Sequence, residues 1–148
     1  MRIVLQSFVF ASMVAVALSG SGCSRSEIVF VSESATYTFQ EVEQLPSALD
    51  RPRHAGTPAT EAPNLRRDAL VELRGMGSEA ADLAELVTRS LPSTTRAVPY
   101  YAEAADVEGV PSWIVVEIWG TGDGTLDYTR TWVLDRATGD VLFSSSGK

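Results

Sequence analysis

The stretch that decides the fold is SWIVVEIW, residues 112–119. Side chains alternate between the two faces of a β-strand. One face of this strand therefore carries Ile114, Val116 and Ile118 and is purely aliphatic, so we expect it to lie in a core. The other face carries Trp113, Val115, Glu117 and Trp119.

Downstream of this strand, the sequence predicts an antiparallel β-meander. Two further strands are expected at 126–134 and 141–143, with connecting turns at 120–124 and 135–139. Gly139 occupies a position suited to positive φ, which glycine adopts without steric cost. Residues 144–148 are expected to form a frayed tail.

Upstream, two amphipathic helices are predicted. The first is capped by Asn64 and covers 65–74, and the second is capped by Ser78 and stops at Pro92. The second helix carries one apolar stripe, formed by Ala80, Leu83, Ala84, Val87 and Leu91. Residues 99–104 could continue as strand or helix, and we favour a strand.

These elements predict an α+β fold in which a helical hairpin packs on an antiparallel meander of three or more strands. We expect the helix ending near Leu91 to cover the aliphatic face of 112–119. Residues 69–86 also resemble one HEAT-type helix pair, so a solenoid with helices continuing through 97–111 stays open as an alternative.

Residues 23–63 precede this predicted 64–148 domain. Ile28–Val31 has the length and composition of a strand, and Thr38 with Glu41 has the spacing of a capping box. The helix that this box starts is expected to stop at Pro46. The proline-rich segment 47–63 is predicted to be a linker or a long surface loop.

Residues 1–22 have the pattern of an export signal. Arg2 precedes a mostly apolar run, Ile3–Leu18, which is shorter than the roughly 20 residues of a spanning helix. Small residues then lead to Cys23, the sole cysteine. This arrangement resembles a bacterial lipoprotein, and the resemblance implies lipidation of Cys23 and anchoring to a cell-envelope membrane.

The lipoprotein pattern departs from the usual one at Gly20, where a leucine is expected. Small residues at Gly20 and Gly22 also suit ordinary signal peptidase, which would release a soluble, secreted protein. Both outcomes stay open at this point. With a single cysteine the chain can form no internal disulfide.

The chain carries a net charge of −7, and removal of 1–22 with its one arginine leaves 11 basic against 19 acidic residues. Such a surface repels nucleic acid, so no nucleic-acid partner is expected. His54, the only histidine, lies in the predicted linker, where no neighbour would hold a catalytic base in place. We predict no catalytic residue.

Asp123, Gly124 and Asp127 invite comparison with a calcium loop. The alternating oxygen ligands and the closing glutamate of an EF-hand are missing, so a turn explains this pattern better. No metal and no cofactor are predicted.

The segment Tyr128–Leu142, with Asp135-x-x-Thr138-Gly139 at its turn, resembles the closing hairpin of PepSY-type domains. With the order of elements before it, the resemblance covers about 79–143. It implies an inhibitory or protein-binding accessory module outside the cytoplasm and not an enzyme. Any target would be another envelope protein, bound in trans.

Four aromatic side chains form a possible binding surface: Trp113, Trp119, Tyr128 and Trp132. If the helices cover the aliphatic face of 112–119, this second face needs another cover. The cover could be residues 28–31, the linker, or a protein or glycan partner.

Overall fold

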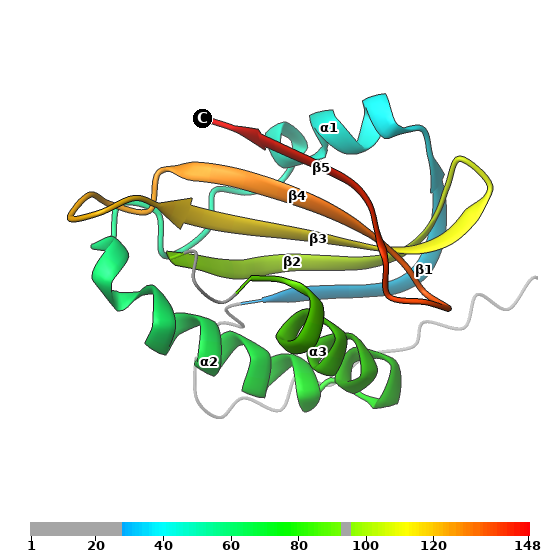
Figure 1. Cartoon of the computed structure of the whole chain (residues 1–148), viewed down its shortest axis with the longest axis horizontal. Helices are drawn as coiled ribbons and strands as arrows, with labels where there is room; N and C mark the ends of the chain where they lie inside the picture. The colour runs from blue at the N-terminus through cyan, green and yellow to red at the C-terminus, as the bar shows by residue number, and fades with distance from the viewer. Residues whose placement is uncertain (1–27, 93–95) are drawn as a thin grey trace, which may run out of the picture.

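The computed structural model describes residues 28–92 and 96–148 and has an α+β fold (Figure 1). The elements in chain order are β1 (Val29–Tyr37), α1 (Phe39–Ala48), a 3-10 turn η1 (Ala59–Glu61), α2 (Ala62–Arg74), α3 (Ser78–Ser90), β2 (Arg96–Val107), β3 (Val110–Gly120), β4 (Tyr128–Asp135) and β5 (Val141–Gly147). The strands form one five-stranded sheet in the order β1-β2-β3-β4-β5.

Strands β2 to β5 form the predicted antiparallel meander, and β1 adds to its edge in parallel with β2. The predicted turn between β4 and β5 is confirmed, because the Asp135 carboxylate accepts the backbone N–H groups of Ala137 and Thr138, and Gly139 has φ +79°. The strand favoured at 99–104 is also confirmed as part of β2. The solenoid alternative is wrong, since 97–111 lies in β2, β3 and the turn between them.

The sheet lies between two helical layers. Helices α2 and α3 pack on one face, where they enclose Ala102, Ala104, Trp113, Val115 and Leu134. Helix α1 covers the other face through Val42, above Ile114, Val116 and Ile118. Figure 1 shows α1 behind the sheet and α2 and α3 in front, toward the β1 edge.

The expectation that the helix ending near Leu91 covers the aliphatic face of β3 is therefore wrong. Its apolar stripe packs instead on the Trp113 face. Ala102 and Ala104 stand beside Val115 and Trp113 in the sheet, and their short side chains leave room for helices to approach that face. The aliphatic face is covered by α1, which the sequence placed outside the domain, together with Ala59 of η1 and Ala62 and Ala69 of α2.

Several element ends differ from the predicted ones. The capping box is confirmed, but Pro46 lies inside α1, which ends two residues later at Ala48. Helix α2 begins at Ala62 without a side-chain cap, in place of the expected Asn64 cap. Helix α3 follows Gly77 as N-cap residue, so Ser78 is its first residue.

The segment 47–63 is not a linker. It contains the end of α1, all of η1 and the start of α2, and Pro58 pairs with Thr125 in an isolated β-bridge. Ala59 and Ala62 are buried. The boundary expected at residue 63 therefore falls within α2.

At the other end, 144–148 is not a frayed tail, because β5 runs to Gly147. Strand β4 begins at Tyr128, two residues after the predicted start. Leu126 lies instead in the β3–β4 connection, where a hydrogen bond holds its backbone. Its backbone N–H donates to the Thr57 carbonyl. Among the described residues, no helix is long and apolar enough to cross a membrane.

Candidate binding surface on strands β3 and β4

Three of the four predicted aromatic residues lie together with an arginine on one face of β3 and β4. In the sheet register Trp119 stands opposite Tyr128, Glu117 opposite Arg130, and Val115 opposite Trp132. Cross-strand partners share a face. We call Trp119, Tyr128, Arg130 and Trp132 the aromatic–arginine strip; all four side chains are half-buried.

The rings at one end of the strip pack on each other. The centroids of Trp119 and Tyr128 are 5.1 Å apart at an interplanar angle of 35°. The Trp119 indole also donates to the Thr129 carbonyl, at 3.3 Å, so its orientation is fixed. Tyr128 is further contacted by Lys148, whose ammonium nitrogen lies 5.5 Å from the ring centroid.

Arg130 lies between two indoles. Its guanidinium carbon is 4.6 Å from the ring centroid of Trp119 and 5.5 Å from that of Trp132. Its Nε donates to the Ser146 hydroxyl on β5 at 3.3 Å. No ion pair joins Arg130 to an acidic residue in the parts of the chain that the structure describes.

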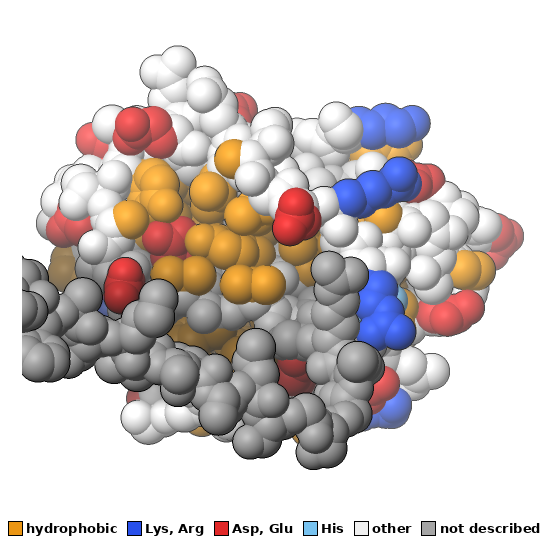
Figure 2. Space-filling view, turned by 180° about the vertical axis from the view of Figure 1, so that it is seen from behind, with side chains coloured by type: hydrophobic (Ala, Val, Ile, Leu, Met, Phe, Trp, Pro, Cys, Tyr) orange, Lys and Arg blue, Asp and Glu red, His pale blue; other side chains and the backbone are white. Residues whose placement is uncertain are grey.

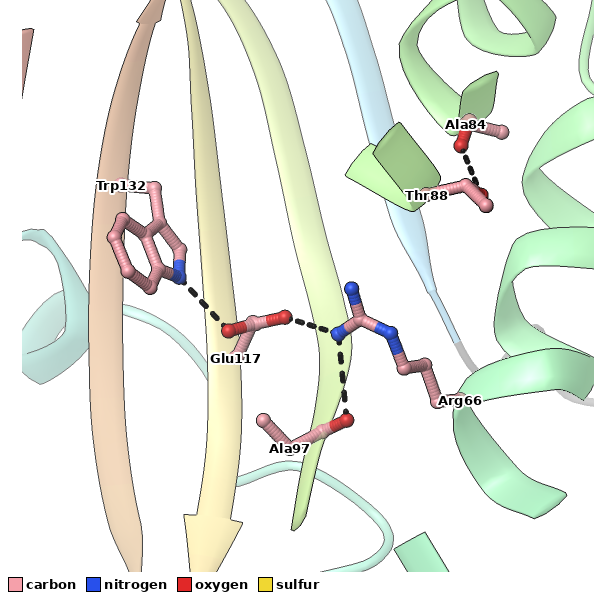
Figure 3. Close-up of polar contacts among 6 residues, drawn as sticks. All are labelled: Arg66, Ala84, Thr88, Ala97, Glu117 and Trp132. Carbon is pink, nitrogen blue, oxygen red and sulfur yellow. Dashed lines mark hydrogen bonds and ion pairs between the residues drawn. The ribbon is translucent and has the colours of Figure 1, made fainter. Parts of the chain in front are cut away.

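A buried ion pair lies beside the strip, on the same face of the sheet (Figure 3). The Glu117 carboxylate, in a residue 1% exposed, accepts from Arg66 of α2 at 2.5 Å and from the Trp132 indole at 2.8 Å. Arg66 also donates to the Ala97 carbonyl at 3.5 Å, and its second terminal nitrogen, Nη2, has no hydrogen-bond partner within the described residues. The network ties the strip to α2 through β3.

The fourth predicted residue, Trp113, lies elsewhere. It is 5% exposed, in the core beneath α3, with its ring centroid 6.1 Å from that of Phe30. The Arg136 guanidinium lies 4.2 Å from the Trp113 ring centroid and pairs with Glu79 at 2.5 Å. Trp113 therefore points to the same side of the sheet as the strip, but it is buried beneath α3 and is not part of the exposed surface.

A second polar cluster, on the α1 side of the sheet, was not predicted from the sequence. Glu103 is 3% exposed, and its carboxylate accepts from the hydroxyls of Tyr37, at 3.1 Å, and Tyr101, at 2.7 Å. Burial, followed by the bond to Glu103 and its charge, raises the pKa of Tyr101. Burial, followed by the charge of Glu103 and the bond to it, raises that of Tyr37.

Next to this cluster an apolar hollow of about 280 Å³ lies between the end of α1 and strands β1 and β2. Its lining includes Val29, Leu49, Tyr100 and Tyr101. Figure 2 shows hydrophobic side chains gathered on this side of the molecule. Burial raises the pKa of Tyr100 to about 12.

The other residues that the sequence analysis examined as candidate sites do not lie together in one site. Cys23 lies outside the described residues. His54 is half-buried between α1 and η1, and Asp123 and Asp127 lie in the β3–β4 connection, where the Asp127 carboxylate accepts the Thr125 hydroxyl. Within 28–92 and 96–148, no group of three or more His, Cys, Asp or Glu side chains could hold a metal ion.

Arg130, Arg66 and Glu103 are the residues that the sequence reasoning missed. For Arg130 a signal was present, because it alternates with Tyr128 and Trp132 along one strand face. Comparison with protein families, curated proteins and solved structures found no match to this chain.

Proposed function

We propose that this protein is a non-catalytic binding module of the bacterial cell envelope, tethered to a membrane through lipid on Cys23. In this proposal the aromatic–arginine strip binds another envelope protein. The resemblance of 128–142 to a PepSY closing hairpin supports an accessory or inhibitory role. The resemblance of 1–23 to a lipoprotein signal supports the tether.

The observation that carries the proposal is the composition and rigidity of the strip. Tryptophan, tyrosine and arginine are the residues that contribute most at the centres of protein interfaces. Here Trp119, Arg130 and Trp132 are each held by a hydrogen bond, to Thr129, Ser146 and Glu117 respectively. Side chains already ordered in this way lose little conformational entropy when a partner binds.

Photo-crosslinking from the strip tests the proposal. A photoreactive phenylalanine derivative replaces Tyr128 in the full chain, expressed in its own envelope. We expect an ultraviolet-dependent adduct with one protein. The matched control places the same group at Val71, which is 59% exposed on α2. Equal labelling from both positions, or none from Tyr128, contradicts the proposal.

The second candidate function is a secreted, soluble ligand-binding module. Gly20 and Gly22, which suit ordinary signal peptidase, favour it. It differs from the first in the fate of Cys23, which would be a free thiol.

A further inference from the structure

The guanidinium of Arg130 is held in place, and its terminal nitrogens can bind an anion. Its side chain is fixed by two indole rings and by the Nε bond to Ser146. The two terminal nitrogens make no hydrogen bond or ion pair with the described residues. A planar guanidinium held in this way can donate two parallel hydrogen bonds to one carboxylate.

The neighbours of Arg130 on its face do not neutralise it. Glu117 stands directly opposite on β3, but its two oxygens already accept from Arg66 and Trp132. Ser146 stands opposite on β5 and is uncharged. The other cation at the strip is Lys148, over the Tyr128 ring. Arg130 and Lys148 therefore place two cations at the strip, on a chain whose net charge is −7.

The spacing of the strip matches an extended peptide. Tyr128, Arg130 and Trp132 occupy alternate positions of β4, so their side chains follow one another at about 7 Å. An extended peptide lying along β4 presents the side chains of one face at the same interval. It can place a central carboxylate on Arg130 while apolar side chains on either side pack on the rings.

We propose that the strip binds an extended acidic segment of the partner protein, in which a Glu or Asp lies between two apolar residues at alternate positions. This inference rests on the proposed function and specifies the partner's chemistry. Binding to an anionic membrane or to nucleic acid is disfavoured because the rest of the acidic surface repels extended polyanions, whereas a single carboxylate needs only the local charge.

The test titrates the full chain, kept in detergent micelles, with two short synthetic peptides. In one, a glutamate lies between two leucines at alternate positions, and in the other a glutamine replaces the glutamate. Trp119 and Trp132 flank Arg130, so their fluorescence reports occupancy. We expect saturable binding of the Glu peptide, weakened by salt, and at least about tenfold weaker binding of the Gln peptide.

Variants of the chain complete the test. Arg130→Gln should weaken binding of the Glu peptide at least about tenfold and remove the preference for Glu, while Arg130→Lys should keep part of it. Arg67→Gln, a matched arginine exposed on α2, should change nothing. Far-ultraviolet circular dichroism confirms that each variant is folded.

Two results overturn the inference. One is equal affinity for the two peptides, or no binding of either, and this result needs no variant. The other is a tryptophan fluorescence change on adding heparin or anionic vesicles, when the Glu peptide produces none. If Tyr128 still crosslinks to a partner protein in these cases, the proposed function stands and only the acidic segment is wrong.

Discussion

Glu117 connects the core to the aromatic–arginine strip. Its carboxylate is buried, and its bonds to Arg66 and Trp132 are the interactions that compensate for the loss of water. Removing either partner leaves a buried group without its counterpart. The cost is then larger than the net contribution of the pair.

We expect Glu117→Ala and Arg66→Ala each to lower the free energy of unfolding by about 3–5 kcal/mol, measured by urea denaturation. The control is Arg67→Ala, whose pair with Asp68 is exposed on both sides and should change stability by less than about 1 kcal/mol. Joint replacement of Arg66 and Glu117 by methionine should recover most of the loss. A small effect of both single variants would contradict the geometry of Figure 3.

We expect the free energy of unfolding to fall above pH 10, because three tyrosines have raised pKa values in the folded chain: Tyr100, Tyr101 and Tyr37. Burial raises the pKa of Tyr100 from its ordinary 10.0 to about 12, so the unfolded chain releases this proton first. The stabilising contribution is complete below pH 10 and decreases as pH rises toward 12, with a slope of about 1.4 kcal/mol per pH unit for Tyr100.

The check is a titration that follows the ultraviolet absorbance of ionised tyrosine as pH rises. Native protein should ionise at higher pH than the same protein in urea. Tyr101→Phe should remove part of that difference, because Tyr101 also has a raised pKa beside Glu103. Coincident native and unfolded titration curves would refute the raised values.

The sequence predicted few of the contacts between individual side chains. The side of β3 on which Glu117 and Trp119 lie follows from alternation, and it is correct. The partner of Glu117 could not be found, because Arg66 is 51 positions away and reaches it only through the placement of α2 on the sheet. Glu103 was missed for the same reason, since Tyr37 comes from a distant strand.

Among the elements, the β3–β4 connection depends on Gly120. A Cβ added there would lie 2.3 Å from the Thr125 carbonyl oxygen and 3.0 Å from the Ala59 side chain. The first contact is with backbone, which cannot rotate away. The same connection pairs with 56–59 through backbone hydrogen bonds, so a shift would be transmitted to η1.

We expect Gly120→Ala to lower the free energy of unfolding by about 1–3 kcal/mol, the usual range for overpacking. Gly147→Ala is the matched control, because its Cβ would meet only the Thr129 hydroxyl, at 3.9 Å. Urea midpoints of the two variants give the comparison. A Gly120→Ala protein as stable as the control would show that the connection can move.

The strand and the turn with the strongest local signals were predicted well, whereas the helix caps expected at Asn64 and Ser78 are absent. The strand at 112–119 and the turn at Asp135–Gly139 follow from alternation and turn chemistry, and both are present. The contribution of β1 and α1 was underestimated, because parallel pairing of β1 with β2 joins segments about seventy positions apart and leaves no local pattern. With α1 omitted, the aliphatic face was assigned to the wrong helix.

For the whole molecule, strand order relates the proposed tether to the strip. Four residues separate Cys23 from Ile28, which immediately precedes edge strand β1. Fully extended, they reach roughly 17 Å. Strand β4 is three strands away from β1, about 14 Å across the sheet. In our proposal the short tether therefore keeps the β1 edge near the membrane.

This arrangement depends on lipid at Cys23, which fractionation and intact-mass spectrometry can test. We expect the mature chain to begin at Cys23, to carry acyl mass and to sediment with membranes, because several acyl chains on one residue bind a bilayer stably. Cys23→Ser should move the protein to the soluble fraction, whereas the control Arg130→Gln should stay with the membrane. A wild-type chain found soluble with an unmodified Cys23 thiol would reject the tether and favour the secreted alternative, while leaving the chemistry of the strip to be judged by the peptide titration.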